Sequence, residues 1–519
     1  MQMDYLLTAQ EMKKADTAMS EQFGMHSLVL MERAALSAFQ IILEKYPDAK
    51  HFLIFCGCGN NGGDGIALAR LLFLAGKEVT IAIPEDTDKH SVSFGVQLHT
   101  AKEYKLSVVS FPAILEHYDH SSYDCIIDAL FGIGLNRELT EPFLSVISAI
   151  NRRAFSVPCI SLDIPSGIHT DTGRIMGSCV RADLTIPFSF HKLGLVRYPG
   201  CEYTGQVILG DAGITEHALS ATPRYFTFTK EDIISRLPRR TGDSNKGSYG
   251  KVLIFAGSKN MAGASILCAN ACFYTGVGMV KLITCEQNRI ILQTSVPEAM
   301  LFTYDTDKKI RIDEELVSWA DSILIGPGIS MQQDAKDIMQ QLLIIMRHHP
   351  EKHLIIDADG LNLIAGEESI RSLFEECTCQ KYLTPHPGEL SRLTKLPIER
   401  LRENPEGCTY ELRQSLSNTI LIGKDSRTMV YDQDSPAIYI NTTGNNGMAT
   451  AGCGDVLSGI LAGLCAQRAI LPVNNSPFDI ACLAVAYHGL LGDFAAAKYG
   501  KAAMKAGDLI RDKFLWEDD

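Results

Sequence analysis

The chain has 519 residues, of which 46% are hydrophobic and 21% charged, and this composition is typical of a soluble globular enzyme with two or more domains. Its formal net charge of −13 argues against nucleic acid or an anionic membrane surface as the main partner. The 15 cysteines show no paired CxxC spacing and no compact disulfide framework, so we expect buried thiols in a reducing, cytoplasmic compartment. We expect neither a signal peptide nor a membrane span, because no long apolar run occurs.

Apolar runs and helical patterns alternate over the first part of the chain. A capping-box pattern at Thr8 and Glu11 predicts an initial helix. The expected strands are His51–Cys56, Val79–Ile83, Cys125–Leu130 and Pro158–Ile164, and the helical patterns between them are Gly65–Ala75, His90–Tyr104 and Glu141–Arg153. This alternation predicts a Rossmann-like parallel sheet with helices on both faces.

The alternation restarts after a polar, turn-rich segment at Arg236–Lys246, which favours a domain boundary near residue 225. The expected strands beyond it are Val252–Ala256, Met279–Thr284, Ser322–Ile325, Leu354–Asp357, Tyr382–Thr384 and Thr419–Ile422, and the closing helices are Ile480–Lys498 and Ala502–Phe514. We therefore predict an α/β protein with two domains, residues 1–225 and 226–519.

A glycine-rich turn near the C-terminus carries the strongest chemical signal. Gly452 and Gly454 flank Cys453, Asp455 follows, and an apolar helical pattern starts at Val456. The unpaired N–H groups and the helix dipole of such a turn suit a phosphate. Asp455 is placed to take a proton from a hydroxyl that attacks a phosphoryl group. The simpler alternative is a plain loop with an acid in the first helical turn.

A second glycine run, Gly57–Gly62, fits GxGxxG after an expected strand, and the acids Glu85–Asp86 stand where a dinucleotide-binding fold places a ribose-binding carboxylate. An NAD-dependent dehydrogenase is the first interpretation. Three features weaken it. The run contains two asparagines, whose side-chain amides a simple pyrophosphate-binding turn does not need. Asp64 would repel bound phosphates. No other segment has the residues expected of a hydride-transfer site.

Two further expected strands end in acids, Asp128 and Asp163, and Ser166 follows the second one closely. The carboxyl ends of parallel strands face the ligand crevice of such a sheet. Asn61, Asp128 and Ser166 could therefore converge and offer oxygen ligands to a cation. Taken singly, each residue is better explained as a cap or turn residue.

The segments Asn60–Gly65, Asp128–Gly132 and Asp163–Gly167 together resemble the NAD(P)H-hydrate epimerases. The second half resembles the ADP-dependent NAD(P)H-hydrate dehydratases, which have a ribokinase-like fold, and the order of the halves is similar to that of the bifunctional NAD(P)H-hydrate repair family. The resemblance implies that (R)- and (S)-NAD(P)HX, the hydrated cofactors, are interconverted. It also implies that the (S) form is dehydrated with ADP, releasing AMP and phosphate, and that K⁺ and Mg²⁺ take part. The expected partners are NADHX, NADPHX and ADP, with no nucleic acid or membrane, in a homo-oligomer.

The resemblance also implies site residues. In the epimerase half, the substrate-binding residues would be Asn60, Asn61, Gly62, Gly63, Asp64, Gly132, Ile133, Gly134, Leu135, Asn136, Arg137, Glu138 and Asp163, the last one also catalytic. Potassium would be held by Asn61, Asp128 and Ser166. In the dehydratase half, Ala264, Gly328, His386 and the catalytic Asp455 would contact the hydrate. The nucleotide would be bound by Lys424, Asp425, Ser426, Arg427, Thr428, Gly452, Cys453 and Gly454.

The phosphate loop departs from the family pattern at three positions: Asn446 replaces a proline, Ala451 a glycine and Cys453 a serine. The departures affect the rate or affinity if the serine hydroxyl matters or if Ala451 needs a positive φ. Asp357 and Asp359 could bind magnesium directly or through water, or serve a turn.

Several simpler interpretations stay open. Lys424 could be a solvated lysine after a strand, and His386 a cap or a packed residue. The whole chain could also be a small-molecule kinase with a Rossmann-like accessory domain, which would release a stable phosphorylated product. A non-catalytic ligand-sensing scaffold is the remaining alternative, although acids kept at a crevice argue against it.

Overall fold

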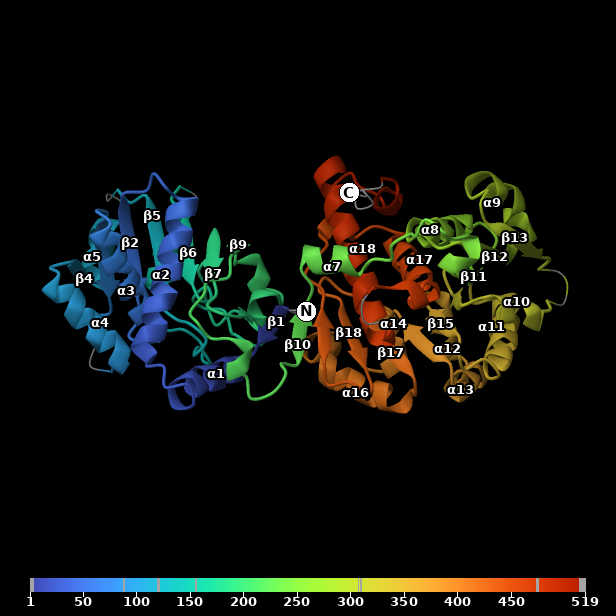
Figure 1. Ribbon diagram of the computed structural model, residues 1–519, viewed down its shortest axis with the longest axis horizontal. Helices are drawn as coiled ribbons and strands as arrows, with labels where there is room; N and C mark the ends of the chain where they lie inside the picture. Colours follow the sequence, from blue (N-terminus) through green and yellow to red (C-terminus); the bar gives the residue numbers. More distant parts are fainter. Residues whose placement is uncertain are drawn as a thin grey trace. The chain divides into compact units, whose positions relative to one another are not determined.

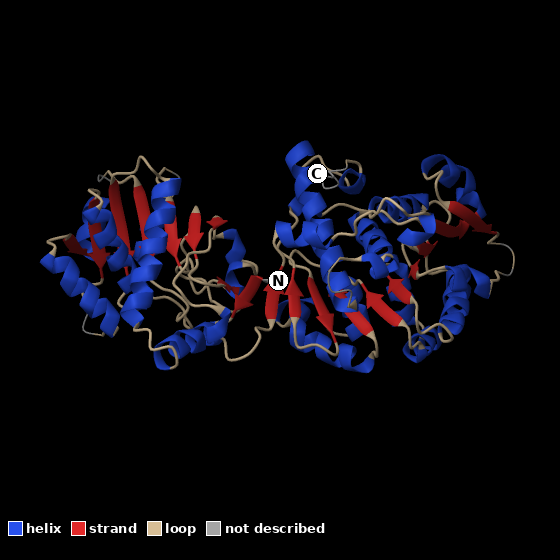
Figure 2. Ribbon diagram, in the orientation of Figure 1, coloured by secondary structure: helices blue, strands red, loops and turns tan. Residues whose placement is uncertain are grey.

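The computed structural model describes residues 4–512, apart from 87–88, 119–121, 155, 307, 309 and 473–475. The chain divides into two compact units, Met1–Phe226 and Thr227–Asp519, and a short strand, β10 (Tyr225–Thr227), spans the division. Strands lie at the centre of each unit and helices surround them (Figures 1 and 2). The expected α/β class is confirmed.

The first unit is built on a seven-stranded sheet in the order β4-β3-β2-β5-β6-β7-β9, in which neighbouring strands run parallel. These strands are β2 (His51–Cys56), β3 (Glu78–Ile83), β4 (Ser107–Ser110), β5 (Cys125–Ala129), β6 (Cys159–Leu162), β7 (Leu184–Ile186) and β9 (Gln206–Val207). Outside this seven-stranded sheet, β1 (Asp4–Leu7) pairs in parallel with β8 (His191–Lys192). The unit's helices are α1 (Ala9–Glu21), α2 (Ser27–Lys45), α3 (Asn60–Leu74), α4 (Val92–Glu103), α5 (Phe111–His117) and α6 (Phe143–Arg153). The capping box predicted for α1 is present, because Thr8 and Glu11 bond each other's backbone N–H groups.

Alternating residues of β2 show why its apolar run forms a central strand. Phe52 and Ile54 pack with α2, α3 and α4 on one face of the sheet. Leu53 and Phe55 pack with α5 and α6 on the other face. A strand that is buried on both faces needs apolar residues at every position, which is the pattern the sequence has.

Helix α3 begins at Asn60, five residues before the expected helical pattern, so the Asn-Asn-Gly-Gly-Asp run forms its first turn instead of a loop. Asparagine and glycine are poor helix formers, and packing overrides that preference in this helix. A Cβ on Gly62 would lie 1.7 Å from the Gly57 carbonyl oxygen, and one on Gly65 would lie 2.6 Å from the Ala129 Cβ atom. The glycines therefore allow the helix to lie directly against the ends of β2 and β5.

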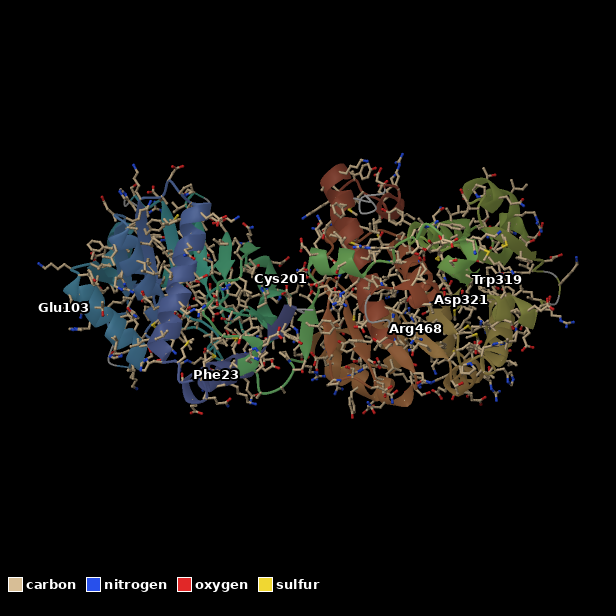
Figure 3. All side chains as sticks on the ribbon, viewed as in Figure 1. Phe23, Glu103, Cys201, Trp319, Asp321 and Arg468 are labelled. Atoms are coloured by element: carbon tan, nitrogen blue, oxygen red, sulfur yellow. The ribbon has the colours of Figure 1, made fainter. Side chains whose placement is uncertain are left out.

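The second unit has the strand order β13-β12-β11-β14-β15-β16-β17-β18-β19, with parallel pairing as far as β17 and antiparallel pairing after it. The strands are β11 (Lys251–Phe255), β12 (Met279–Cys285), β13 (Met300–Tyr304), β14 (Ser322–Ile325), β15 (His353–Ile356), β16 (Gln380–Leu383), β17 (Thr419–Gly423), β18 (Met429–Asp432) and β19 (Ile438–Ile440). Trp319 and Asp321, labelled in Figure 3, precede β14, and Asp321 accepts the Lys251 N–H at 2.9 Å, which ties the start of β11 to β14.

Two groups of helices cover this second sheet (Figure 1). One group contains α8 (Ala262–Tyr274), α17 (Cys453–Ala466) and α18 (Pro477–Tyr499). The other contains α11 (Gln333–Met346), α12 (Asp359–Gly366), α13 (Glu368–Glu376) and α14 (Pro387–Thr394). The remaining helices are α7 (Lys230–Arg236), α9 (Arg289–Ser295), α10 (Glu314–Trp319), α15 (Ile398–Glu403) and α16 (Pro405–Ser415).

The two expected closing helices have different outcomes. Helix α18 is confirmed; it is long and apolar enough to cross a membrane, but 72% of its most apolar window is buried, as in the core helix of a globular domain. The helix expected at Ala502–Phe514 is wrong in its described part, where a short 3₁₀ turn at Ala506–Ile510 follows a loop. Gly500 has φ 79° and ends α18, so the chain changes direction before that segment.

Candidate active sites

The first unit contains a cavity of about 1080 Å³ at the carboxyl ends of its central strands. A cavity of this size and position is the usual place for a ligand in such a sheet. The predicted substrate-binding residues that line it are Asn60, Asn61, Asp64, Gly132, Ile133, Gly134, Leu135, Arg137 and Asp163. Gly62 and Gly63 lie beneath the surface in the first turn of α3, and Asn136 and Glu138 are exposed outside the lining.

Three of these residues converge at one wall of the cavity. A Cβ on Gly132 would lie 3.0 Å from the Asp163 Oδ2 atom and 3.4 Å from the Asn61 Cβ atom. Asp163 follows β6 directly and has φ 66°, a left-handed conformation that non-glycine residues rarely adopt. The wall is therefore tight, and Asp163 is held there in a strained backbone conformation.

Asp128 and Ser166 lie behind that wall. Asp128 is fully buried and accepts hydrogen bonds from the Ser161 hydroxyl (2.8 Å), the Ser166 N–H (2.8 Å) and hydroxyl (2.6 Å), and the Leu130 N–H (3.2 Å). Burial raises the pKa of Asp128, and these hydrogen bonds oppose the change only in part. Every one of these donors is electrically neutral.

The side-chain amide of Asn61 is buried, and neither its Oδ1 nor its Nδ2 atom has a hydrogen-bond partner among the described residues. A buried amide without partners costs free energy, so this geometry is suited to a ligand that completes it. The turn that follows β5 carries Gly132, which lies against Asn61, and Phe131, whose N–H donates to the Ser166 hydroxyl at 2.9 Å. The structure therefore brings Asn61 and Ser166 to the same turn.

Sequence reasoning missed four charged residues of this cavity: Lys13 and Asp16 on α1, Lys89, and Lys192 on β8. The Lys192 side chain is 1% exposed, and its Nζ atom lies 2.5 Å from the Asp163 Oδ1 atom. A lysine inside the apolar run Phe190–Leu195 was the signal that could have found it, because a buried lysine needs a partner.

The second predicted site lies at the start of α17. Gly452 has φ 94° and precedes the first helical turn, and no side chain caps that turn. A Cβ on Gly454 would lie 3.3 Å from the Lys424 Nζ atom, so the lysine ammonium is beside the open helix end. Ala451 is not among the described non-glycine residues with a positive φ, so its replacement of a glycine introduces no left-handed strain.

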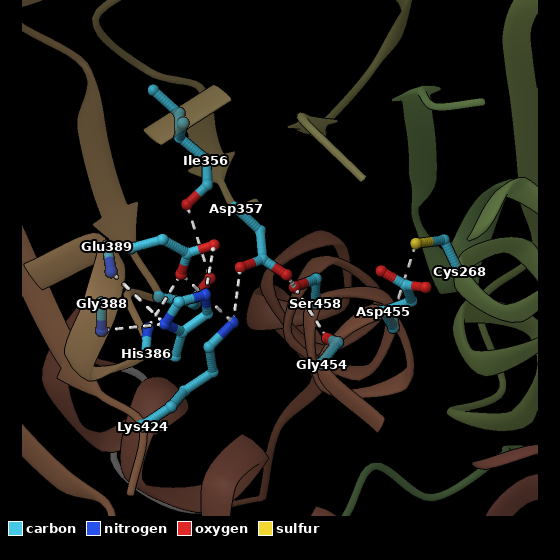
Figure 4. Close-up of polar contacts among 11 residues, drawn as sticks. Cys268, Ile356, Asp357, His386, Gly388, Glu389, Lys424, Gly454, Asp455 and Ser458 are labelled. Atoms are coloured by element: carbon cyan, nitrogen blue, oxygen red, sulfur yellow. Dashed lines mark hydrogen bonds and ion pairs between the residues drawn. The ribbon is translucent and has the colours of Figure 1, made fainter. Parts of the chain in front are cut away.

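Asp455 stands in the first turn of α17, half-buried, and its backbone carbonyl accepts a hydrogen bond from the Cys268 thiol at 3.3 Å (Figure 4). Burial, reinforced by the nearby charges of Asp357 and Asp359, raises the pKa of Asp455 to about 6. A carboxylate with a pKa near neutrality is suited to proton transfer at cellular pH. Burial also raises the pKa of the Cys453 thiol, to about 11, so this residue stays neutral.

Lys424 is not a solvated lysine, because its side chain is 18% exposed and belongs to a charged network (Figure 4). Its Nζ atom lies 2.7 Å from the Asp357 Oδ1 atom and 4.0 Å from the Glu389 Oε2 atom. The other Asp357 oxygen accepts the Ser458 hydroxyl at 2.5 Å. Burial alone would raise the pKa of Asp357, but Lys424 and the hydrogen bonds outweigh it and lower that pKa.

His386 caps α14, as the simpler interpretation held: its Nδ1 atom accepts the Gly388 N–H at 3.0 Å. The ring is nevertheless half exposed, and its Nε2 atom lies 3.3 Å from the Glu389 Oε1 atom. Glu389, for which the sequence suggested no role, is buried, and burial raises its pKa to about 7 although Lys424 opposes the change. The network therefore extends from His386 to Asp357.

The other predicted dehydratase residues occupy two places. Gly328 has φ 61°, and a Cβ there would lie 3.0 Å from the Ala264 Cβ atom, so these two residues touch. Ala264 lies one turn before Cys268 on α8. In the segment after β17, Asp425 and Ser426 are exposed, Arg427 and Thr428 are half-buried, and Arg427 donates to the Thr442 carbonyl at 3.3 Å.

Comparison with known proteins covers both units. The protein-family model described as NAD(P)H-hydrate dehydratase matches residues 252–514. The family model described as YjeF-related protein N-terminus matches residues 27–194. Two solved structures resemble the chain in part. A Bacillus subtilis ADP/ATP-dependent NAD(P)H-hydrate dehydratase crystallised with ATP and Mg²⁺ is 25% identical, with 56% of this chain and 96% of that chain covered and a TM-score of 0.47. A ribokinase-like superfamily protein from Enterococcus faecalis is 30% identical, with 56% and 93% covered and a TM-score of 0.46.

Full-length relatives match almost the whole chain. The bifunctional NAD(P)H-hydrate repair enzyme of Moorella thermoacetica is 34% identical, with 98% of this chain and 95% of the relative covered. The corresponding enzyme of Escherichia coli is 32% identical, with 97% and 92% covered, and that of Leishmania braziliensis is 31% identical, with 98% and 92% covered. Both domain matches and these identities lead to one conclusion: the chain belongs to the family of bifunctional NAD(P)H-hydrate repair enzymes.

Proposed function

We propose that this protein repairs hydrated NAD(P)H in two steps. The first unit interconverts (R)- and (S)-NAD(P)HX, and the second dehydrates (S)-NAD(P)HX with ADP, releasing NAD(P)H, AMP and phosphate. The observation that carries the proposal is the group of charged residues at the start of α17, where Asp455, with a pKa of about 6, and Lys424 stand beside an uncapped helix end. Such a site can hold a phosphoryl group and deprotonate the hydroxyl that attacks it.

The dehydration chemistry explains why a kinase-like site is needed. Hydroxide is a poor leaving group, and transfer of the β-phosphoryl group of ADP to the C6 hydroxyl converts it into phosphate, a good one. Asp455 accepts the hydroxyl proton, while Lys424 and the amides of Gly452–Gly454 stabilise the charge on the transferring group. The lone pair of the ring nitrogen then expels phosphate, and loss of a proton from the neighbouring carbon restores the double bond.

For epimerisation we propose that Asp163 exchanges a proton with the C6 hydroxyl of the substrate in the cavity. Asn61, Asp128 and Ser166 would hold K⁺, whose positive charge would balance the buried Asp128 carboxylate and help to orient the ligand. Each Asp128 oxygen accepts two hydrogen bonds, but all of these donors are neutral, so a cation would still balance the charge of this buried carboxylate. The Asn61 amide oxygen has no partner among the described residues and could be a ligand.

The two acids that the sequence suggests for Mg²⁺ already have protein partners in the second site. Both Asp357 oxygens are engaged, one by Lys424 and the other by Ser458. The Asp359 Oδ2 atom accepts the Ser330 N–H at 2.9 Å. We therefore propose that Mg²⁺ would enter with the nucleotide phosphates, which keeps the Asp455 carboxylate available as the base. A cytoplasmic location and a homo-oligomeric state remain expectations from the sequence.

The test follows NADH absorbance with mixed-epimer NADHX, purified full-length protein, Mg²⁺, K⁺ and ADP. Complete conversion to NADH is the expected result, because it requires both activities. Conversion that stops at the share of one epimer would remove the epimerase half of the proposal. If no rise follows with either ADP or ATP, the dehydratase half fails and a kinase for another hydroxyl compound becomes the better explanation.

Asp163→Asn separates the two halves of the proposal. It should lower the epimerisation rate by about 10²–10⁴-fold, to a small residual rate, and leave dehydration of pure (S)-NADHX unchanged, since the predicted sites lie in different units. Loss of both activities in a folded variant would contradict the assignment of one reaction to each unit.

A further inference from the structure

Lys192 is a charged residue of the cavity to which the proposed mechanism gives no role. Its side chain is 1% exposed, and its Nζ atom lies 2.5 Å from the Asp163 Oδ1 atom and donates to the Phe188 carbonyl at 2.9 Å. It also lines the cavity. A lysine buried this deeply is tolerated only when its charge is paired and its N–H groups are hydrogen-bonded. The burial of Lys192 therefore depends on its ion pair with Asp163.

The pairing fixes the orientation of the Asp163 carboxylate. One oxygen is held by Lys192, and the other, Oδ2, is turned toward Gly132 in the cavity wall. The Asp163 N–H donates to the Ile186 carbonyl at 2.8 Å, which anchors the backbone in its left-handed conformation at φ 66°. Such a conformation is strained, and it persists only where surrounding contacts determine it.

Lys192 also limits the accumulation of negative charge in the cavity. Asp16 and Asp64 line the same cavity as Asp163. Burial and the charge of Asp163 raise the pKa values of both acids, and Lys192 opposes that rise in each case. Without the ammonium group, Asp163 would face two further carboxyl groups and would have no cationic partner at hydrogen-bonding distance among the residues that the structure describes.

We propose that Lys192 is a positioning residue of the epimerase site: its ammonium holds the Asp163 carboxylate with one oxygen directed at the substrate. The proposal rests on the proposed function of the first unit. It predicts that Lys192 acts through Asp163, so the lysine affects turnover more than substrate affinity. A displacement of about 1 Å in a reacting group costs about 100-fold in rate.

The first test is Lys192→Met, assayed for epimerisation and, in the same protein, for dehydration of pure (S)-NADHX. We expect epimerase kcat to fall about 100-fold, KM to change less than about threefold, and dehydration to stay unchanged. Lys192→Arg, which keeps the charge, should recover part of the lost kcat. Lys77→Met is the matched control, because Lys77 is in the same unit, lies outside the cavity and donates to the Ala49 carbonyl; it should leave both rates unchanged.

A double-mutant cycle separates positioning from a merely structural role. If Lys192 acts through Asp163, the variant Asp163→Asn/Lys192→Met should have the same residual epimerase rate as Asp163→Asn. The double variant also removes both charges of the buried pair, so it leaves no unpaired buried charge that would unfold the first unit. If Lys192→Met alone unfolds, the double variant can still be assayed.

Three results would count against these inferences. An epimerase kcat for Lys192→Met within about threefold of wild type overturns the role of Lys192, and so does an independent, multiplicative loss in the double variant. Wild-type protein that dehydrates (S)-NADHX but does not epimerise overturns the proposed function of the first unit instead, and Lys192 then has no reaction in which to position Asp163.

Discussion

Replacement of Asp455 by asparagine should stabilise the second unit and at the same time nearly abolish dehydration. Asparagine has the same size and shape as aspartate, so it fits the first turn of α17 without a new clash. It removes only the charge and the ability to accept a proton. The two effects have opposite signs because the same environment that raises the pKa of Asp455 makes its ionised form costly.

The size of the stabilisation follows from the pKa. Burial is the main cause that raises it from 3.8 to about 6, and at about 1.4 kcal/mol for each pH unit this difference corresponds to about 3 kcal/mol. Because the side chain is only half-buried, solvent screening reduces the effect, and we expect about 1–2 kcal/mol at neutral pH. A raised carboxyl pKa favours folding below the unfolded-state value, and this contribution is lost as pH rises through about 6. The advantage of the asparagine variant should therefore be about half as large at about pH 5 as at about pH 7.5.

Two measurements check this prediction. Denaturant unfolding of both proteins between about pH 5 and pH 8 gives the difference in stability, and NADH absorbance with pure (S)-NADHX and ADP gives dehydration. The variant should lose about 10²–10⁴-fold in rate, and the wild-type rate should fall below about pH 6 as the base becomes protonated. A variant that retains dehydration would refute Asp455 as the base, and one that is less stable at neutral pH would refute the electrostatic argument.

Three further predictions concern neighbouring features of the two sites. Lys424→Met should weaken ADP binding about 10-fold or more by calorimetry and destabilise the second unit by about 3–5 kcal/mol, because it leaves Asp357 buried and unpaired; equal ADP affinity would contradict its phosphate role. Asn61→Ala should remove the dependence of epimerisation on K⁺, measured by titration with KCl against a choline chloride control, and an unchanged K⁺ response would contradict the assigned ligand. Gly62→Ala should prevent correct folding of the first unit, since its Cβ would meet the Gly57 carbonyl at 1.7 Å, whereas Gly59→Ala, which has open space, should fold with unchanged circular dichroism; two equally stable variants would contradict this packing argument.

The central strands of the sheets were predictable from sequence because they are buried on both faces, whereas the edge strands β4 and β13 are partly exposed and were not predicted. Runs such as His51–Cys56 and Leu354–Asp357 are apolar apart from one end residue each. The observed strands His51–Cys56 and His353–Ile356 coincide with them or differ by one residue at each end. Local composition gave wrong helix predictions at two places where tertiary packing determines the backbone conformation. The start of α3 at Asn60 depends on contact between glycine Cα atoms and neighbouring strands, which no helix propensity contains. In residues 502–512, the described part of the last expected helix, favourable helix composition did not outweigh the turn at Gly500.

The sequence by itself determined the two α/β units and the glycine turns, since these depend on short-range patterns of apolar, glycine and acidic residues. Only the tertiary structure decided which charges meet. Lys424 pairs with Asp357 across 67 residues of chain, and Lys192 reaches Asp163 from a different strand. It also decided that Asp455 has a pKa of about 6, because that value depends on burial and on acids contributed by other elements. Ion pairs and pKa values depend on distance in space and on exclusion of water, and neither is encoded in the local order of residues.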